Sequence, residues 1–302
     1  MTRRNATLLG FIAVLLWGVL ALLTVGAAPT PPLLLNTICF AIGGTLGLIW
    51  TTASGQLGAL RTVPLHVYAM GTLGLFGYHA LYFTALRLAP AAEASLIAYL
   101  WPLLIVLFSG LLPGEKLRAG HVAGALIGFA GAALIITGGG TGFNSAALPG
   151  YLVASVCALT WSGYSVLSRV FGTAPTASVA VFCLASAALS YPLHLALEQP
   201  LWPQDAKTWA SAIALGFGPV GLAFYVWDIG VKRGDIQLLG TASYAAPLIS
   251  TVVLVLAGVA AATWVIGAAA ALVTAGAMLA ARASARVKDG ASGTKDVSPK
   301  VG

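Results

Sequence analysis

The spacing of the charged residues constrains this chain more than any other feature. Long stretches contain no Asp, Glu, Lys or Arg at all: residues 5–60, 62–86, 94–114, 119–168, 170–197, 208–227 and 236–281. A transmembrane helix needs about 20 mostly apolar residues. The three longest stretches have room for two helices each and the others for one each, which predicts ten transmembrane helices.

The composition agrees with a membrane protein. Only 8% of the residues are charged and 59% are hydrophobic, whereas a soluble domain has about 25% charged residues. This excludes a disordered chain, a nucleic-acid-binding arm and an ordinary cytosolic enzyme. The apolar stretches neither alternate nor stop after about 10 residues, as barrel strands do. We therefore expect an all-α integral membrane protein.

Proline and glycine divide the long apolar stretches into single spans. Pro29 to Pro32 interrupt the first, Gly138 to Gly150 the second and Gly258 the third, and both residue types favour turns. The predicted spans are 6–26, 33–52, 64–86, 91–111, 119–138, 147–168, 176–197, 208–230, 236–257 and 261–281.

Arg3 and Arg4 before an apolar stretch resemble a signal peptide, but the stretch exceeds a signal core of about 15 residues, so we expect an uncleaved helix.

The basic residues lie almost entirely on one side of this ten-helix topology. Alternate loops and the termini receive 13 Lys and Arg residues, and the opposite loops receive only Arg87 and Lys207. Cytoplasmic loops carry the excess of basic residues. We therefore expect a multi-pass protein of the bacterial inner membrane with both termini in the cytoplasm.

The two halves of the chain repeat one another. Trp17 in the first span and Trp161 in the sixth are 144 residues apart, and Tyr99 matches Tyr244 at 145. Five helices per repeat is an odd number, so the second copy enters the membrane from the opposite side. Inverted repeats are typical of secondary transporters. We expect one repeat over 1–140, the inverted repeat over 141–285 and a disordered cytoplasmic tail over 286–302.

A known family shares these features. The segment Ala-x-x-Ala-Ser-Leu-Ile-Ala-Tyr-Leu-Trp-Pro-Leu, which ends at Leu103, resembles the EamA type of the drug/metabolite transporter superfamily, as does the loop from Gly114 to Leu117. Ala260 departs from the pattern, because the family often has Glu there. The aromatic segments Tyr78–Phe83 and Tyr99–Pro102 are similar to the YddG-type aromatic amino acid exporters. This resemblance implies export of amino acids from the cytoplasm without direct use of ATP.

The third span carries a stripe of polar aromatic residues. Tyr78, His79 and Tyr82 have helical spacings that place them on neighbouring faces. Since a polar ring inside a bilayer is costly without a partner, we expect all three to line a substrate cavity. The alternatives are a packing histidine that bonds a backbone carbonyl of a neighbouring helix and an aromatic belt at the membrane interface.

Two prolines occupy corresponding positions within the fourth and ninth spans. Pro102 removes a helical hydrogen bond and leaves a carbonyl free near Ala98, and Pro247 does the same near Ser243. Paired broken helices often mark a transport site. Aromatic faces nearby can stack on a ring or hold a cation. The further candidates for substrate binding are Tyr99, Trp101, Trp17, Trp161 and Tyr244, while the alternative is that both prolines only kink helices for packing.

No motif for other chemistry is present in the sequence. There is no Walker ATP site, no Ser/His/Asp cluster and no zinc-binding helix motif, and the three cysteines are far apart. We expect no cofactor, no metal, no nucleic-acid partner and no enzymatic activity. The expected partners are the lipid bilayer and an amino acid substrate.

Small residues recur every fourth position in the fifth span. Gly120, Gly124 and Gly128 allow a close helix approach, and we expect the partner to be the Gly267, Ala271 and Ala275 series of the tenth span. Packing within one chain would use up this surface, so a monomer is favoured over a homodimer.

These observations predict a secondary exporter of aromatic and other neutral amino acids that works by alternating access through a central cavity. An exporter of another small metabolite or a drug is the first alternative. A membrane-embedded enzyme is the second and is disfavoured, because no polar catalytic cluster is present.

Overall fold

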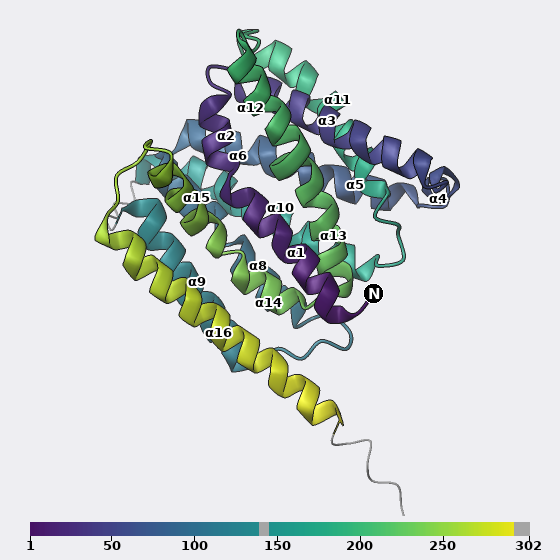
Figure 1. Cartoon of the computed structure of the whole chain (residues 1–302), viewed down its shortest axis with the longest axis vertical. Coiled ribbons are helices and arrows are strands. Elements are labelled where there is room, and N and C mark those ends of the chain that lie inside the picture. Colours follow the sequence, from purple (N-terminus) through teal and green to yellow (C-terminus); the bar gives the residue numbers. More distant parts are fainter. Residues whose placement is uncertain (139–144, 293–302) are drawn as a thin grey trace, which may run out of the picture.

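Helices make up all the regular structure in the residues that the computed structural model describes, 1–138 and 145–292 (Figure 1). The first half contains α1 (Arg3–Gly18), α2 (Leu20–Gly26), α3 (Pro32–Ala53), α4 (Leu57–Leu60), α5 (Leu65–Thr72), η1 (Leu73–Gly77), α6 (Tyr78–Leu88), α7 (Ala91–Ala98), α8 (Trp101–Ser109) and α9 (Ala119–Thr137).

The second half begins with a short 3₁₀ turn and ends with a long helix. It contains η2 (Ser145–Ala147), α10 (Leu148–Val170), α11 (Ser178–Leu197), α12 (Ala206–Phe217), η3 (Gly218–Leu222), α13 (Ala223–Arg233), α14 (Ile236–Ala242), α15 (Ala245–Leu256) and α16 (Trp264–Ser292).

Most of these helices are long and apolar enough to cross a membrane. Within the described residues, nine helical segments meet that condition. The predicted span over 64–86 is not among them. It corresponds to α5, η1 and α6, which are helical without a gap but carry the polar aromatic residues His66, Tyr68, Tyr78, His79 and Tyr82.

The predicted boundaries differ from the observed ones mainly at the last helix. Gly258 takes the left-handed conformation, with φ +71°, which ends the preceding segment as expected. The next helix begins at Trp264 and not at residue 261. It continues to Ser292, so the part of the predicted disordered tail over 286–292 is helical. Residues 293–302 lie outside the described part of the chain.

Interruptions of the helices recur at matched positions in the two halves. The π-helical turns η1 and η3 begin 145 residues apart, at Leu73 and Gly218. The breaks between α7 and α8 at Tyr99 and between α14 and α15 at Tyr244 show the same offset. Each break lies three residues before a proline, Tyr99 before Pro102 and Tyr244 before Pro247, as predicted from the two prolines.

The helices associate across the two halves of the sequence. α1 packs mainly against α13 and α15, and α2 packs against α12 and α15. We call this set bundle A (α1–α2, α12–α13 and α14–α15). α10 packs mainly against α6, α7 and α8, which form bundle B (α5–α6, α7–α8 and α10). α3 and α11 pack closely against each other (Figure 1). Each bundle thus takes helices from both halves.

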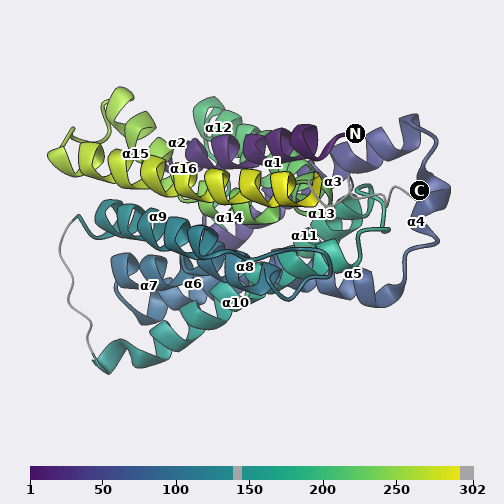
Figure 2. The ribbon, with the colours of Figure 1, turned by 90° about the horizontal axis from the view of Figure 1, so that it is seen from below.

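α9 and α16 form an outlying pair beside the two bundles (Figures 1 and 2). The predicted close approach of these helices is present, but the face of α16 is different. A Cβ on Gly124 would lie 2.6 Å from the Gly276 carbonyl oxygen, and one on Gly120 would lie 2.9 Å from the Ala283 Cβ. Nothing in the described residues lies within 4 Å of such an atom on Gly267. Gly276, Ala280 and Ala283 therefore replace the predicted Gly267 series.

Candidate functional site

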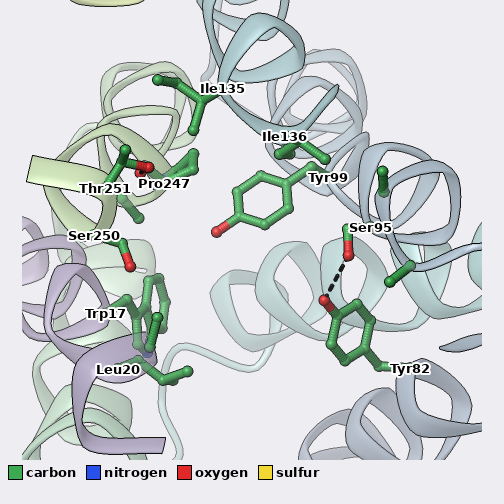
Figure 3. A pocket seen from close by; sticks show the side chains of 14 residues that line it. Trp17, Leu20, Tyr82, Ser95, Tyr99, Ile135, Ile136, Pro247, Ser250 and Thr251 are labelled. Carbon is green, nitrogen blue, oxygen red and sulfur yellow. Dashed lines mark hydrogen bonds between the residues drawn. The ribbon is translucent and has the colours of Figure 1, made fainter. Parts of the chain in front are cut away.

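A cavity of about 400 Å³ lies between the two bundles. Trp17, Leu20 and Ala21 of bundle A face it, together with residues of α15, and bundle B supplies residues of α6 and α7 (Figure 3). α9 closes one side. Among the described residues, the lining consists of Trp17, Leu20, Ala21, Tyr82, Ala91, Ala92, Ser95, Tyr99, Ile135, Ile136, Ala246, Pro247, Ser250 and Thr251. A volume of this size is typical of small-molecule sites.

The cavity walls combine aromatic rings with neutral hydroxyl groups. Tyr99 extends its hydroxyl into the space between the bundles, towards Ser250 (Figure 3). The Tyr82 hydroxyl and Ser95 Oγ are 2.8 Å apart and form a hydrogen bond. Thr251 donates to the Pro247 carbonyl oxygen at 2.9 Å. None of the described residues that line the cavity is charged, so the walls suit a ligand without net charge.

Four tryptophans meet at Trp17, one from each of four helices. Trp17 and Trp227 come from bundle A, and Trp101 and Trp161 come from bundle B. The ring centroid of Trp17 lies 5.1 Å from that of Trp227, 5.9 Å from that of Trp161 and 6.0 Å from that of Trp101. The remaining pairs are 5.8 to 6.3 Å apart. We call these four side chains the tryptophan cluster.

The tryptophan cluster closes the cavity towards the first residue of α1. Trp17 lines the cavity, whereas Trp101, Trp161 and Trp227 are buried behind it, with at most 4% exposure. Two of the four indole N–H groups have protein partners: that of Trp17 donates to the Pro219 carbonyl at 3.2 Å and that of Trp227 to Ser165 Oγ at 3.1 Å. Each such contact between rings contributes about 0.5–1.5 kcal/mol to stability. The cluster therefore holds bundles A and B tightly together at this level.

Tyr78 and His79 lie in a second layer behind the cavity lining. The Tyr78 ring stacks on that of Tyr82, with 6.1 Å between centroids, and contacts Trp161. His79 Nδ1 is 2.7 Å from the Leu75 carbonyl oxygen, which can only accept, so the proton of this hydrogen bond is on Nδ1. The His79 ring packs edge-on against Phe40. His79 therefore bonds a backbone carbonyl, but one in the preceding turn of its own helical segment and not one of a neighbouring helix, as the alternative had it.

Tyr244 lies outside the cavity lining. Its side chain is fully buried and packs against Phe129. Its hydroxyl accepts a hydrogen bond from the backbone N–H of Leu103 at 3.0 Å. Tyr244 thus joins the two broken helices and has no access to the cavity. The Ser243 carbonyl, predicted to be free, accepts from the Ala246 N–H at 3.0 Å.

The acidic residues nearest the spans have structural partners. Asp228 is fully buried and pairs with Lys232 one helical turn later at 2.8 Å, and it also accepts from Thr176 at 2.8 Å. The carboxylate of Glu93 accepts a hydrogen bond from the Tyr151 hydroxyl. In the described part of the chain, no group of three or more His, Cys, Asp or Glu side chains could hold a metal ion.

Sequence reasoning missed four residues of this region. Trp227 completes the tryptophan cluster, and it stands 145 residues after Tyr82, the offset of the internal repeat, so the repeat alone could have indicated it. Ser95, Ser250 and Thr251 supply cavity hydroxyls. Serine and threonine are common on helix surfaces, and no spacing rule distinguishes those that face a cavity.

Comparison with known proteins gives the family. The model of the EamA-like transporter family matches the chain twice, over residues 4–137 and 148–282. The chain belongs to the EamA-like transporter family. The resemblance to EamA transporters inferred from the sequence is thereby confirmed, and this EamA protein is a multi-pass membrane protein.

Relatives of this EamA protein include named exporters. The aromatic amino acid exporter YddG of Ancylobacter novellus is 53% identical over 93% of this chain and 98% of its own. The YddG proteins of Salmonella typhimurium and Escherichia coli are 27% and 26% identical, each over 83% of this chain and 88% of their own. A solved crystal structure that is 53% identical superposes with a TM-score of 0.88, over 92% of this chain and 98% of that one.

Proposed function

We propose that this EamA transporter exports aromatic and other neutral amino acids across the bacterial inner membrane, driven by their gradient and not by ATP. The observation that carries the proposal is the uncharged cavity of aromatic rings and hydroxyls between the two bundles. The YddG relatives, which are named aromatic amino acid exporters, support the same substrate class.

The cavity lining suggests how such a substrate is held. An amino acid zwitterion carries no net charge, and the hydroxyls of Tyr99, Ser95 and Ser250 can bond its ammonium and carboxylate groups. The aromatic side chain would contact the Trp17 ring at the base of the cavity. An acidic or basic side chain would meet no opposite charge there and would lose its hydration, so net-neutral substrates are favoured.

Ten spans in two inverted repeats would provide the alternating access. The paired π-turns and paired helix breaks, each 145 residues apart, support one repeat over 1–140 and a second over 141–285, as does the double match of the family model. We propose that α5 through α6 is the remaining span, third along the chain, with Tyr78, His79 and Tyr82 turned to the protein interior. The basic loops favour cytoplasmic termini, which makes the cavity face outward.

Flux in reconstituted vesicles tests this function. Vesicles preloaded with unlabelled tryptophan should accumulate labelled tryptophan by exchange through the protein, without ATP. Phenylalanine, tyrosine and neutral aliphatic amino acids should compete, and glutamate and lysine should not. Exchange that competes instead with a drug or a sugar derivative, and not with aromatic amino acids, would contradict the substrate assignment.

A further inference from the structure

Four charged side chains meet where the two bundles touch, on the side of the tryptophan cluster away from the cavity. Arg3 begins α1, and Asp235 directly precedes α14, so both belong to bundle A. Glu115 follows α8, and Arg169 is near the end of α10, so both extend from bundle B. The two arginines and the two carboxylates of this set have no net charge together.

The contacts of these side chains join the two bundles through Arg3–Glu115 and through Arg169, while Arg3–Asp235 lies within bundle A and Arg169–Glu115 within bundle B. Arg3 Nη2 lies 3.1 Å from Glu115 Oε2 and 3.8 Å from Asp235 Oδ2. Arg169 pairs with the other oxygen of Glu115. Its second guanidinium nitrogen donates to the carbonyl oxygens of Val231 at 2.8 Å and Gly234 at 2.9 Å, both in bundle A. Glu115 therefore binds two arginines, and Arg169 bridges the bundles.

Burial makes these contacts stronger than ordinary surface ion pairs. The Glu115 side chain is 6% exposed, that of Asp235 9% and that of Arg169 17%, whereas Arg3 is 39% exposed. Exposed pairs contribute about 0–1 kcal/mol because water screens them. A buried charge that loses its partner, in contrast, is left unpaired at a high cost.

The order of residues along the helices places this group opposite the cavity mouth. On α1 and α2, Arg3 precedes Trp17, and Ala21 in the cavity wall follows. On the fourth span the order is reversed: cavity residue Ser95 precedes Trp101, and Glu115 follows. Figure 2 shows the first residues of α1 near one end of the molecule and α2, α7 and α15 near the other. A passage to the side of Arg3 could open only if bundles A and B separated there.

We propose that Arg3, Glu115, Arg169 and Asp235 form the inner lock of the transport cycle, an ion-pair network that holds the cytoplasmic side closed while the cavity is open outward. The lock rests on the proposed transport function, since it has a role only if the two bundles move. Its residues do not touch the substrate. They set the balance between the outward-open and inward-open states.

A second ion pair provides a matched control. Arg87 at the end of α6 lies 3.5 Å from Glu198, which follows α11. Glu198 also accepts from the backbone N–H of Leu33 at the start of α3, at 3.0 Å. This pair joins bundle B to α11 and α3, so it does not cross from bundle A to bundle B. Its loss should leave the balance between the two states unchanged.

Labelling of a buried cysteine from the cytoplasmic side measures that balance. Val106 is fully buried on α8, where its Cγ2 would lie 3.0 Å from a Cβ on Gly240 of α14 in bundle A. Val106→Cys should react with a membrane-impermeant maleimide in inside-out vesicles only when the bundles separate. The native cysteines are buried, and the protein without the added cysteine gives the background.

The lock predicts a selective change in this labelling rate. Glu115→Gln or Arg169→Gln should raise it at least about fivefold, because a buried ion pair is lost whose partner is left unpaired. Arg87→Gln should leave it unchanged. Equal rates in Glu115→Gln, Arg87→Gln and the parent Val106→Cys protein, whose lock is intact, would overturn the proposal.

Cross-linking replaces one ion pair of the lock by a covalent link between the bundles. In the Arg3→Cys/Glu115→Cys protein, whose cysteines belong to bundle A and bundle B, a short bifunctional thiol reagent should abolish tryptophan exchange while outward binding of tryptophan persists. With a cleavable reagent, reduction should restore exchange. Exchange at the full rate in the cross-linked protein would exclude the lock.

The two proposals can fail separately. If the uncross-linked protein exchanges no amino acid at all while the labelling rate still responds to Glu115→Gln, the proposed substrate is wrong and the proposed lock is supported.

Discussion

The interface between bundles A and B has two chemically different halves. The half that contains the cavity is lined by neutral hydroxyls and aromatic rings and stays open, whereas the half beyond the tryptophan cluster is closed by four charges in balance. A hydroxyl group can both donate and accept hydrogen bonds, so it can bond either water or an amino acid zwitterion. Oppositely charged side chains that are shielded from water hold the two bundles together, because separating them would leave each charge buried without a partner. The comparison suggests that recognition and closure use separate residues.

The tryptophan cluster divides the two halves, and its loss should have the largest effect. Trp101→Ala removes a ring that is 4% exposed and contacts the other three tryptophans. We expect a loss of about 3–5 kcal/mol in the free energy of unfolding and loss of tryptophan exchange. Thermal unfolding in detergent and vesicle flux measure the two effects.

The stacked pair of Trp202 and Trp209 supplies the control, since both rings are about 40% exposed. Trp202→Ala should change stability and flux little. Equal losses in the two variants would show that the cluster is no more important than any other aromatic contact.

Tyr99 and Tyr244 are matched by the internal repeat but lie in different surroundings. Tyr99→Phe removes a cavity hydroxyl and should raise the KM for tryptophan by about three- to tenfold, the value of one neutral hydrogen bond. Tyr244→Phe leaves the Leu103 N–H without its acceptor and should lower the stability by about 1 kcal/mol with no change in KM. Concentration-dependent exchange and thermal unfolding separate the two. A larger KM change for Tyr244→Phe would place the site elsewhere.

His79 should show the smallest effect of these residues. It lies behind the cavity lining and bonds a backbone carbonyl of its own helix. His79→Phe keeps the ring packing against Phe40, and we expect exchange within about twofold of the native rate. Loss of exchange in a correctly folded His79→Phe protein would return His79 to the group of residues that contact the substrate.

The sequence predicted the elements that depend on composition and failed where three-dimensional packing decides. Charge-free stretches placed the helices, and Pro102 and Pro247 located the breaks, because these are local effects. Trp17, Tyr82 and Tyr99 line the cavity as expected. Tyr244 does not, because its ring packs against Phe129 and its hydroxyl meets the backbone N–H of Leu103.

The inner network could not be predicted from sequence spacing. Arg3 and Glu115 are 112 residues apart, and Arg169 and Glu115 are 54 apart. Such distances match no helical periodicity, and Arg3 and Arg169 also count among the basic loop residues that orient a membrane protein. A basic residue that only orients the protein in the membrane therefore cannot be told from one that belongs to the proposed lock by sequence position alone.

Protection of a cavity cysteine by substrate tests most directly whether aromatic amino acids bind between the bundles. Ala21→Cys lines the cavity, and Gln204→Cys on an exposed loop serves as the control. We predict that external tryptophan slows modification of Ala21→Cys by an impermeant maleimide, that lysine does not, and that neither affects Gln204→Cys. Modification of Ala21→Cys at one rate with and without saturating tryptophan would contradict the account.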